Sequence, residues 1–103
     1  MTSQENASGK PLADINWLSN HHKAKLKERT TFALQLAQFN PKSIVDLGCA
    51  SGLWLELLDA YMPSDCIFIG IDSDKEALTV AETRSRAWKH SATFMKLNIE
   101  EDA

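Results

Sequence analysis

The sequence predicts an α/β fold in which helices alternate with the strands of a doubly wound parallel sheet. Short apolar runs over residues 43–47, 66–71 and 92–97 alternate with segments of helical periodicity. The second run is apolar almost throughout, which is typical of a strand covered on both faces of a parallel sheet. A glycine-containing turn over residues 48–52 joins the first run directly to the next helix, as in proteins that hold a nucleotide-like ligand.

Length and composition limit the class of protein. A chain of 103 residues with 44% hydrophobic and 24% charged residues is one small globular domain. The formal charge of −3 and the pI near 5.5 provide no general electrostatic attraction to nucleic acid or to an anionic membrane. No apolar run approaches a membrane span, and Met1–Lys10 lacks the apolar core of a signal peptide. We therefore expect a cytoplasmic protein with no membrane partner.

The N-terminal part divides into a tail and the start of the domain. Residues 1–11 are mostly small and polar, and a disordered tail is predicted over residues 1–13, before a single domain over residues 14–103. Helical periodicity predicts one helix from about Asp14 to Phe39. Asn40-Pro41 ends it, because proline cannot continue a helix.

The remaining elements follow in strict alternation. A helix over Leu53–Tyr61 comes after the glycine turn, and the second strand ends at Asp72. Ser73–Glu76 has the pattern of a capping box and predicts a helix that runs to about Lys89. The third strand is expected over Ala92–Leu97. Right-handed crossovers then place consecutive strands side by side.

Glycines and acids gather where the first two strands end. Gly48 and Gly52 have no Cβ, so the backbone can turn sharply there and approach a ligand closely. The turn leads to a helix N-terminus, whose unpaired N–H groups attract a carboxylate or phosphate. Asp46 ends the first strand, and Asp72 follows 26 positions later (72 minus 46) at the end of its neighbour. The pattern indicates a cofactor site.

These residues resemble a known family. Val45–Gly52 resembles motif I of the class I S-adenosylmethionine-dependent methyltransferases, an acid followed by a glycine-rich turn. Phe68–Asp72 is similar to their second motif, and Leu97–Glu100 to the turn after their third strand. The resemblance covers about Pro41–Asp102. It implies a Rossmann-like sheet with strand order 3-2-1-4-5-7-6, of which only the first three strands are present.

The resemblance also implies a cofactor, S-adenosylmethionine, with S-adenosylhomocysteine as product. Asp46 would hold the turn and the ammonium group, and Asp72 would accept hydrogen bonds from the ribose hydroxyls. Asn98, where an aspartate is common, would meet the adenine amine, and Ile99 would pack on the ring. Ala50 replaces the commoner middle glycine of the turn. The residues that the resemblance assigns to the cofactor are Asp46, Gly48, Cys49, Ala50, Gly52, Asp72, Ser73, Asn98 and Ile99.

Each candidate also has a plain structural interpretation. Asp46 can cap local backbone N–H groups, and Asp72 can be a solvated strand end. Cys49 is expected to pack beside the turn, because no base lies near it in the sequence. His21-His22 has no second ligand pair for a metal, which favours a solvated helix start. Arg29 can meet the cofactor's carboxylate from the first helix, or form a surface ion pair.

The family's activity is transfer of the sulfonium methyl group to O, N, C or S. The sequence names no catalytic base, and a small-molecule methyl acceptor is only a default. One alternative is a non-catalytic half-domain, because the first strand would be an exposed edge that a second copy or a partner completes. Another is an NAD(P)-binding domain, but its Gly-x-Gly-x-x-Gly motif would need glycines where the chain has Ala50 and Leu53.

Overall fold

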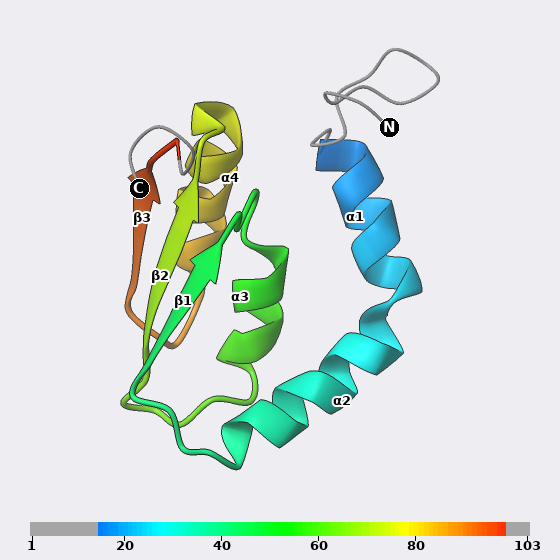
Figure 1. The fold of residues 1–103 in the computed structure, drawn as a ribbon, viewed down its shortest axis with the longest axis vertical. Helices are drawn as coiled ribbons and strands as arrows, with labels where there is room; N and C mark the ends of the chain where they lie inside the picture. The colour runs from blue at the N-terminus through cyan, green and yellow to red at the C-terminus, as the bar shows by residue number, and fades with distance from the viewer. Residues whose placement is uncertain (1–14, 99–103) are drawn as a thin grey trace.

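The structure is a computed structural model that describes residues 15–98. The predicted disordered tail and Ile99 lie outside these residues. Helices and strands alternate after an initial pair of helices, as Figure 1 shows. In chain order the elements are α1 (Ile15–Ala24), α2 (Leu26–Ala37), β1 (Ser43–Leu47), α3 (Leu53–Asp59), β2 (Ile67–Asp72), α4 (Lys75–Ser85) and β3 (Ala92–Lys96). Within this part of the chain, no helix is both long enough and apolar enough to span a membrane.

The sheet has the predicted topology. Its strands are parallel in the order β1-β2-β3, so that Asp46 pairs with Gly70, and Asp72 with Lys96. Each crossover passes through one helix and moves in the same direction across the sheet. Because parallel crossovers are right-handed, successive helices then lie on the same face. This arrangement confirms the predicted α/β class and leaves β1 at one edge of the described sheet.

The covered face of the sheet holds the core. The buried residues Leu55 of α3 and Phe68 of β2 belong to one cluster with Ala33 of α2. On the opposite face, Val45 is 52% exposed and Leu47 64% exposed. Ile67 of β2 is also exposed, at 48%, so the expectation that β2 is covered on both faces is wrong for the described residues. The other side chains of the core cluster are Leu58, Met62 and Cys66.

The single helix predicted from Asp14 to Phe39 is two helices. The chain bends at Lys25, whose φ of −105° and ψ of 8° interrupt the helical backbone, although its N–H still reaches the carbonyls of His21 and His22 at 3.1 Å. The bend lets α2 bury Ala33 in the core while α1 turns His22 inward. The local pattern contains no proline or glycine, so only the packing of the two helices marks the bend.

Both ends of the predicted 73–89 helix are also corrected. The N-cap is Asp74, whose carboxylate accepts hydrogen bonds from the N–H groups of Glu76 at 3.0 Å and Ala77 at 3.2 Å. The predicted capping box at Ser73 is therefore wrong by one residue. The helix ends at Ser85, because the chain must turn so that the Lys89 and His90 N–H groups reach Asp59.

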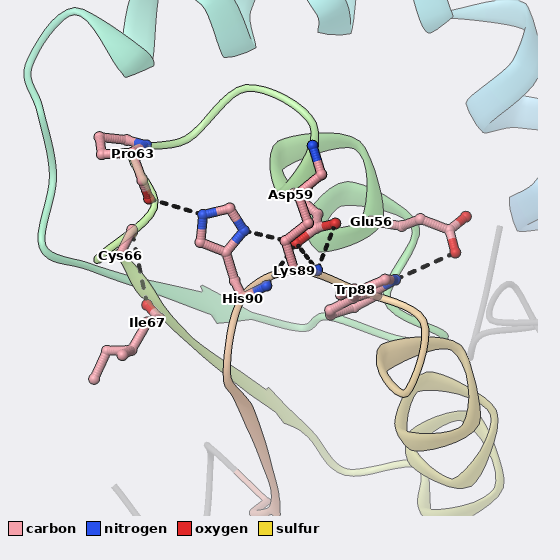
Figure 2. Close-up of polar contacts among 8 residues, drawn as sticks. All are labelled: Glu56, Asp59, Pro63, Cys66, Ile67, Trp88, Lys89 and His90. Atoms are coloured by element: carbon pink, nitrogen blue, oxygen red, sulfur yellow. Dashed lines mark hydrogen bonds and ion pairs between the residues drawn. The ribbon is translucent and has the colours of Figure 1, made fainter.

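A buried ion pair closes the end of the sheet where the strands begin, as Figure 2 shows. Asp59, at the end of α3, accepts hydrogen bonds from the backbone N–H groups of Lys89 and His90, both at 2.9 Å. Its Oδ1 lies 2.6 Å from Nδ1 of His90, and Nε2 of that ring donates to the Pro63 carbonyl at 2.8 Å. The ring also stacks on Phe68, with 4.7 Å between centroids. This cluster ties together three segments that are far apart in the sequence.

Candidate functional site

The glycine turn is anchored to the end of β2. The carbonyl of Ile71 accepts hydrogen bonds from the N–H groups of Gly48 at 2.7 Å and Cys49 at 3.0 Å. Gly48 and Gly52 have φ values of +77° and +84°, which side chains rarely tolerate. Gly52 then begins α3, so the turn runs from strand to helix as the sequence predicts.

Ala50 occupies the same unusual backbone region. Its φ is +48°, in the left-handed region that the commoner middle glycine would adopt without strain. The structure therefore keeps the turn's backbone geometry despite this departure from the motif, at some cost in conformational energy.

Asp72 joins the two turns at this end of the sheet. Its Oδ2 accepts a hydrogen bond from the Ala50 N–H, and its Oδ1 one from the Asp74 N–H, both at 2.8 Å. Asp72 is therefore not merely a solvated strand end. Each carboxylate oxygen retains a second lone pair that can accept a hydrogen bond from a ligand.

Asp46 borders a small cavity beside the turn. Burial, and then the charge of Asp72, raises the pKa of its carboxyl group to about 6. No described residue forms a hydrogen bond or ion pair with this carboxylate, so the backbone-capping interpretation has no support within residues 15–98. A cationic ligand group would lower the cost of keeping Asp46 charged.

Cys49 packs beneath the turn, as expected. It is buried, and its Sγ lies only 2.8 Å from the position that a Cβ on Gly70 would take. Burial, together with the charges of Asp46 and Asp72, raises the pKa of the thiol to about 12. The thiol is therefore protonated at neutral pH, which favours the packing interpretation of Cys49 over a nucleophilic one.

The cavity at the turn continues into a larger cleft. The cavity has a volume of about 120 Å³ and the cleft one of about 440 Å³, and they share His21, Arg29 and Trp54. The Arg29 guanidinium lies over the Trp54 ring, 5.1 Å from its centroid. The two together form a crevice from the turn to the bend between α1 and α2. The cavity is lined by Leu18, His21, Arg29, Asp46, Gly48, Cys49, Ala50, Ser51, Leu53 and Trp54.

Residues of α1 and α2 contribute more to the candidate site than the sequence suggests. Arg29 contacts no carboxylate within residues 15–98, so the surface ion pair is wrong; its Nη1 instead donates to Nδ1 of His22 at 2.7 Å. His22 is 9% exposed and not at a solvated helix start. Its ring is too far along the sequence from the glycine motif for spacing alone to connect them.

Four predicted site residues line the cavity, and the other predicted residues within 15–98 do not. Gly52 lies behind the turn, where an added Cβ would be 3.2 Å from Ala81. Ser73 and Asn98 are exposed and do not line the cavity. Sequence reasoning missed Ser51, whose buried hydroxyl has no hydrogen-bond partner among the described residues. Within residues 15–98, no group of three or more His, Cys, Asp or Glu could hold a metal ion.

Two curated proteins are similar in sequence to parts of this chain. Carboxy-S-adenosyl-L-methionine synthase of Trichodesmium erythraeum is 37% identical over 49 residues, covering 47% of this chain and 19% of that protein. Protein-lysine N-methyltransferase efm4 of Schizosaccharomyces pombe is 27% identical over 95 residues, covering 86% of this chain and 37% of that protein. The chain thus spans well under half of these relatives. No protein-family model matches it.

A solved structure shares the fold. The O-methyltransferase TomG of Streptomyces achromogenes, in complex with SAM, superposes with a TM-score of 0.64 at 14% identity, covering 73% of this chain and 34% of that one. The parallel sheet, its helices and the glycine turn form a Rossmann-like unit. In fold and in partial sequence similarity, this unit resembles the cofactor-binding part of the class I methyltransferases, a family whose cofactor is S-adenosylmethionine.

Proposed function

We propose that this chain binds S-adenosylmethionine and forms the cofactor half of an enzyme that transfers its methyl group. The observation that carries the proposal is the glycine turn, fixed to β2 through the Ile71 carbonyl and the Asp72 carboxylate. This geometry leaves a cavity bordered by a carboxylate from Asp46 and a guanidinium from Arg29. The amino-acid end of the cofactor carries the matching ammonium and carboxylate groups.

The amino-acid end of the cofactor suits the cavity on one side of the turn, and its ribose and adenine suit the side of the turn where Asp72 lies. We assign the ammonium group to Asp46 and the carboxylate to Arg29, where both pairs would be charge-assisted. The ribose hydroxyls would donate to the free lone pairs of Asp72, which lies on the other side of the turn. The adenine would then extend toward Ser73, Asn98 and Ile99, as the resemblance implies.

The cofactor would supply an electrophilic methyl group on a sulfonium. The residues of this chain would bind and orient it, since much of such catalysis is positioning. During transfer the methyl–sulfur bond breaks, a bond to the acceptor nucleophile forms, and S-adenosylhomocysteine leaves. We propose a small-molecule acceptor as the default and assign no catalytic base.

The exposed face of the sheet and the unpaired edge of β1 among the described strands favour a partner that completes the sheet. Val45 and Leu47 are exposed apolar residues of β1, and no described strand pairs with the outer edge of β1. We propose that further strands of a longer polypeptide, a second copy or another partner complete the sheet there. The exposed edge also favours the second candidate, a non-catalytic pairing half-domain. Solution mass of the isolated chain, with methyl transfer by any longer form, distinguishes the two candidates.

The cysteines support a proposal for the compartment. Cys49 and Cys66 are both buried and free, which is typical of a reducing environment. We therefore propose the cytoplasm.

Calorimetric titration with S-adenosylhomocysteine tests the proposed function, with NAD as the control ligand. Saturable binding of the first ligand alone is expected. Arg29→Ala should weaken that binding about tenfold or more, because it removes a charge-assisted partner of the carboxylate. Lys42→Ala is the matched control, since Lys42 forms an exposed ion pair with Asp65, away from the crevice. Equal affinity in the Arg29 and Lys42 variants would remove Arg29 from the site.

A further inference from the structure

The contact between His22 and Arg29 specifies the protonation of the histidine ring. Nη1 of Arg29 lies 2.7 Å from Nδ1 of His22. Every guanidinium nitrogen is a donor, so Nδ1 must accept and the ring proton lies on Nε2. The geometry therefore requires a neutral His22.

The surroundings of His22 favour the same state. Burial lowers the pKa of His22, and the positive charge of Arg29 on α2 lowers it further. Arg84 on α4 and His21 on α1 act in the same direction, while Glu56 on α3 opposes them. The groups that face the ring from all four helices thus leave a neutral imidazole at neutral pH.

Protonation would reverse this contact. A doubly protonated ring would present an N–H to the guanidinium, and two positive charges would face each other without a shared acceptor. Arg29 has no carboxylate partner within residues 15–98 that would hold it in place instead. Among the described residues, the guanidinium otherwise contacts the Trp54 ring, whose attraction is weaker than a hydrogen bond from a charged donor. The guanidinium would therefore leave its position in the crevice.

We propose that His22 is a positioning residue: as a neutral acceptor it holds the Arg29 guanidinium over Trp54, where the guanidinium captures the ligand's carboxylate, and acid releases that hold. This inference rests on the proposed function, which makes that carboxylate the amino-acid end of the cofactor. His22 itself lines a different cleft, with Glu56 and Arg84, and acts only through Arg29.

Calorimetry of two His22 variants separates positioning from packing. His22→Phe keeps a buried ring but removes the acceptor, and it should weaken S-adenosylhomocysteine binding about tenfold at pH 7.5. His22→Asn retains an uncharged acceptor that does not titrate, so it should restore most of this affinity. Circular dichroism checks that each variant folds. If His22→Phe binds as tightly as the wild type, the positioning role is wrong.

Titration of the His22 ring in the wild-type chain by NMR tests the role without relying on the affinity of a variant. Asp46 also titrates near pH 6, so the pH dependence of affinity alone would mix the two groups. If the ligand binds the neutral form of His22 tenfold more tightly, then saturating S-adenosylhomocysteine lowers the midpoint of His22 by about one pH unit. The His22→Asn spectrum assigns the resonance among the chain's 3 histidines.

The outcomes separate the two proposals. A lowered midpoint supports the positioning role of His22. A midpoint that is unchanged or raised while the ligand binds overturns that role and leaves the proposed function standing. If the folded wild-type chain binds no S-adenosylhomocysteine, the proposed function fails and the inference fails with it.

Discussion

The pKa values of two partly buried acids, one at each end of the sheet, are shifted in opposite directions. Where the strands begin, hydrogen bonds from the His90 ring and from the backbone N–H groups of Lys89 and His90 outweigh burial and lower the pKa of Asp59. Where the strands end, Asp46 has no such donors within the described residues, and burial raises its pKa to about 6. The Ser51 hydroxyl at this second end is buried without a partner as well.

This difference indicates that one end of the sheet stabilises the fold and that the other end is suited to bind a ligand. Where the strands begin, the Asp59 carboxylate and both ring nitrogens of His90 have hydrogen-bond partners, which is what stability requires of buried polar groups. The end with the glycine turn keeps unmet hydrogen-bonding capacity, which a ligand with complementary charges can satisfy.

The largest expected effect comes from removing the pair of Asp59 and His90 where the strands begin. Asp59→Ala leaves the buried His90 ring without its carboxylate and should cost about 3 kcal/mol of unfolding free energy, within the range for broken buried pairs. Urea denaturation measures this loss. Asp65→Ala removes an acid from an exposed pair with Lys42 and should leave the urea midpoint nearly unchanged. Equal midpoints in the two variants would show that the buried pair contributes nothing special.

At the opposite end, Asp72→Ala should weaken S-adenosylhomocysteine binding by about 1.5–3 kcal/mol, because it removes the carboxylate assigned to the ribose. It also frees the N–H groups of Ala50 and Asp74, so a smaller loss of stability should accompany it. Calorimetry measures the affinity. Asp59→Asn is the matched control for an aspartate that holds backbone N–H groups but lies far from the turn, and its affinity should equal that of the wild type. A folded Asp72→Ala variant with unchanged affinity would remove the ribose assignment.

The pH dependence of stability sharpens the contrast between the two acids. The raised pKa of Asp46 gives a stabilising contribution that is complete below pH 3.8 and is lost as pH rises through about 6. The lowered pKa of Asp59 has the opposite sign, because its contribution is present above pH 3.8 and is lost as pH falls through its folded value. Asp46→Asn should therefore raise the urea midpoint above that of the wild type by more at pH 7.5 than at pH 5. The same variant should weaken ligand binding. A variant with the wild-type pH profile would contradict the pKa of Asp46.

The smallest expected effect concerns backbone strain in the turn. Ala50→Gly relieves the left-handed conformation of Ala50 but adds freedom to the unfolded chain, for a net gain of about 0.5 kcal/mol. Thermal unfolding measures the gain. Because the backbone already has the required φ, ligand affinity should stay constant. A loss of stability would mean that the Ala50 methyl group contributes packing that outweighs the strain.

Local patterns predicted the strands and the turn well. The apolar runs, Gly48 and Gly52 each act within a few residues, so the parallel order of the sheet and the position of the turn followed directly. Ser73 was wrongly expected to cap α4, because both Ser73 and Asp74 are good caps and the choice depends on Asp72 holding the Asp74 N–H.

Contacts between distant segments could not be predicted in this way. The Asp59–His90 pair joins residues 31 positions apart, and nothing near either residue indicates the other. The bend at Lys25 depends on how α1 and α2 pack, and so does the burial of His22 against Arg29. These features arise only once the helices lie on the sheet.

We propose that the end of the sheet with unmet polar groups binds S-adenosylmethionine. Calorimetric titration of the isolated chain with S-adenosylhomocysteine and with NAD tests this binding, after the folding and solution mass of the chain are established. We predict saturable binding of S-adenosylhomocysteine with no heat from NAD. A folded chain that binds neither ligand, or that binds NAD, would contradict the claim.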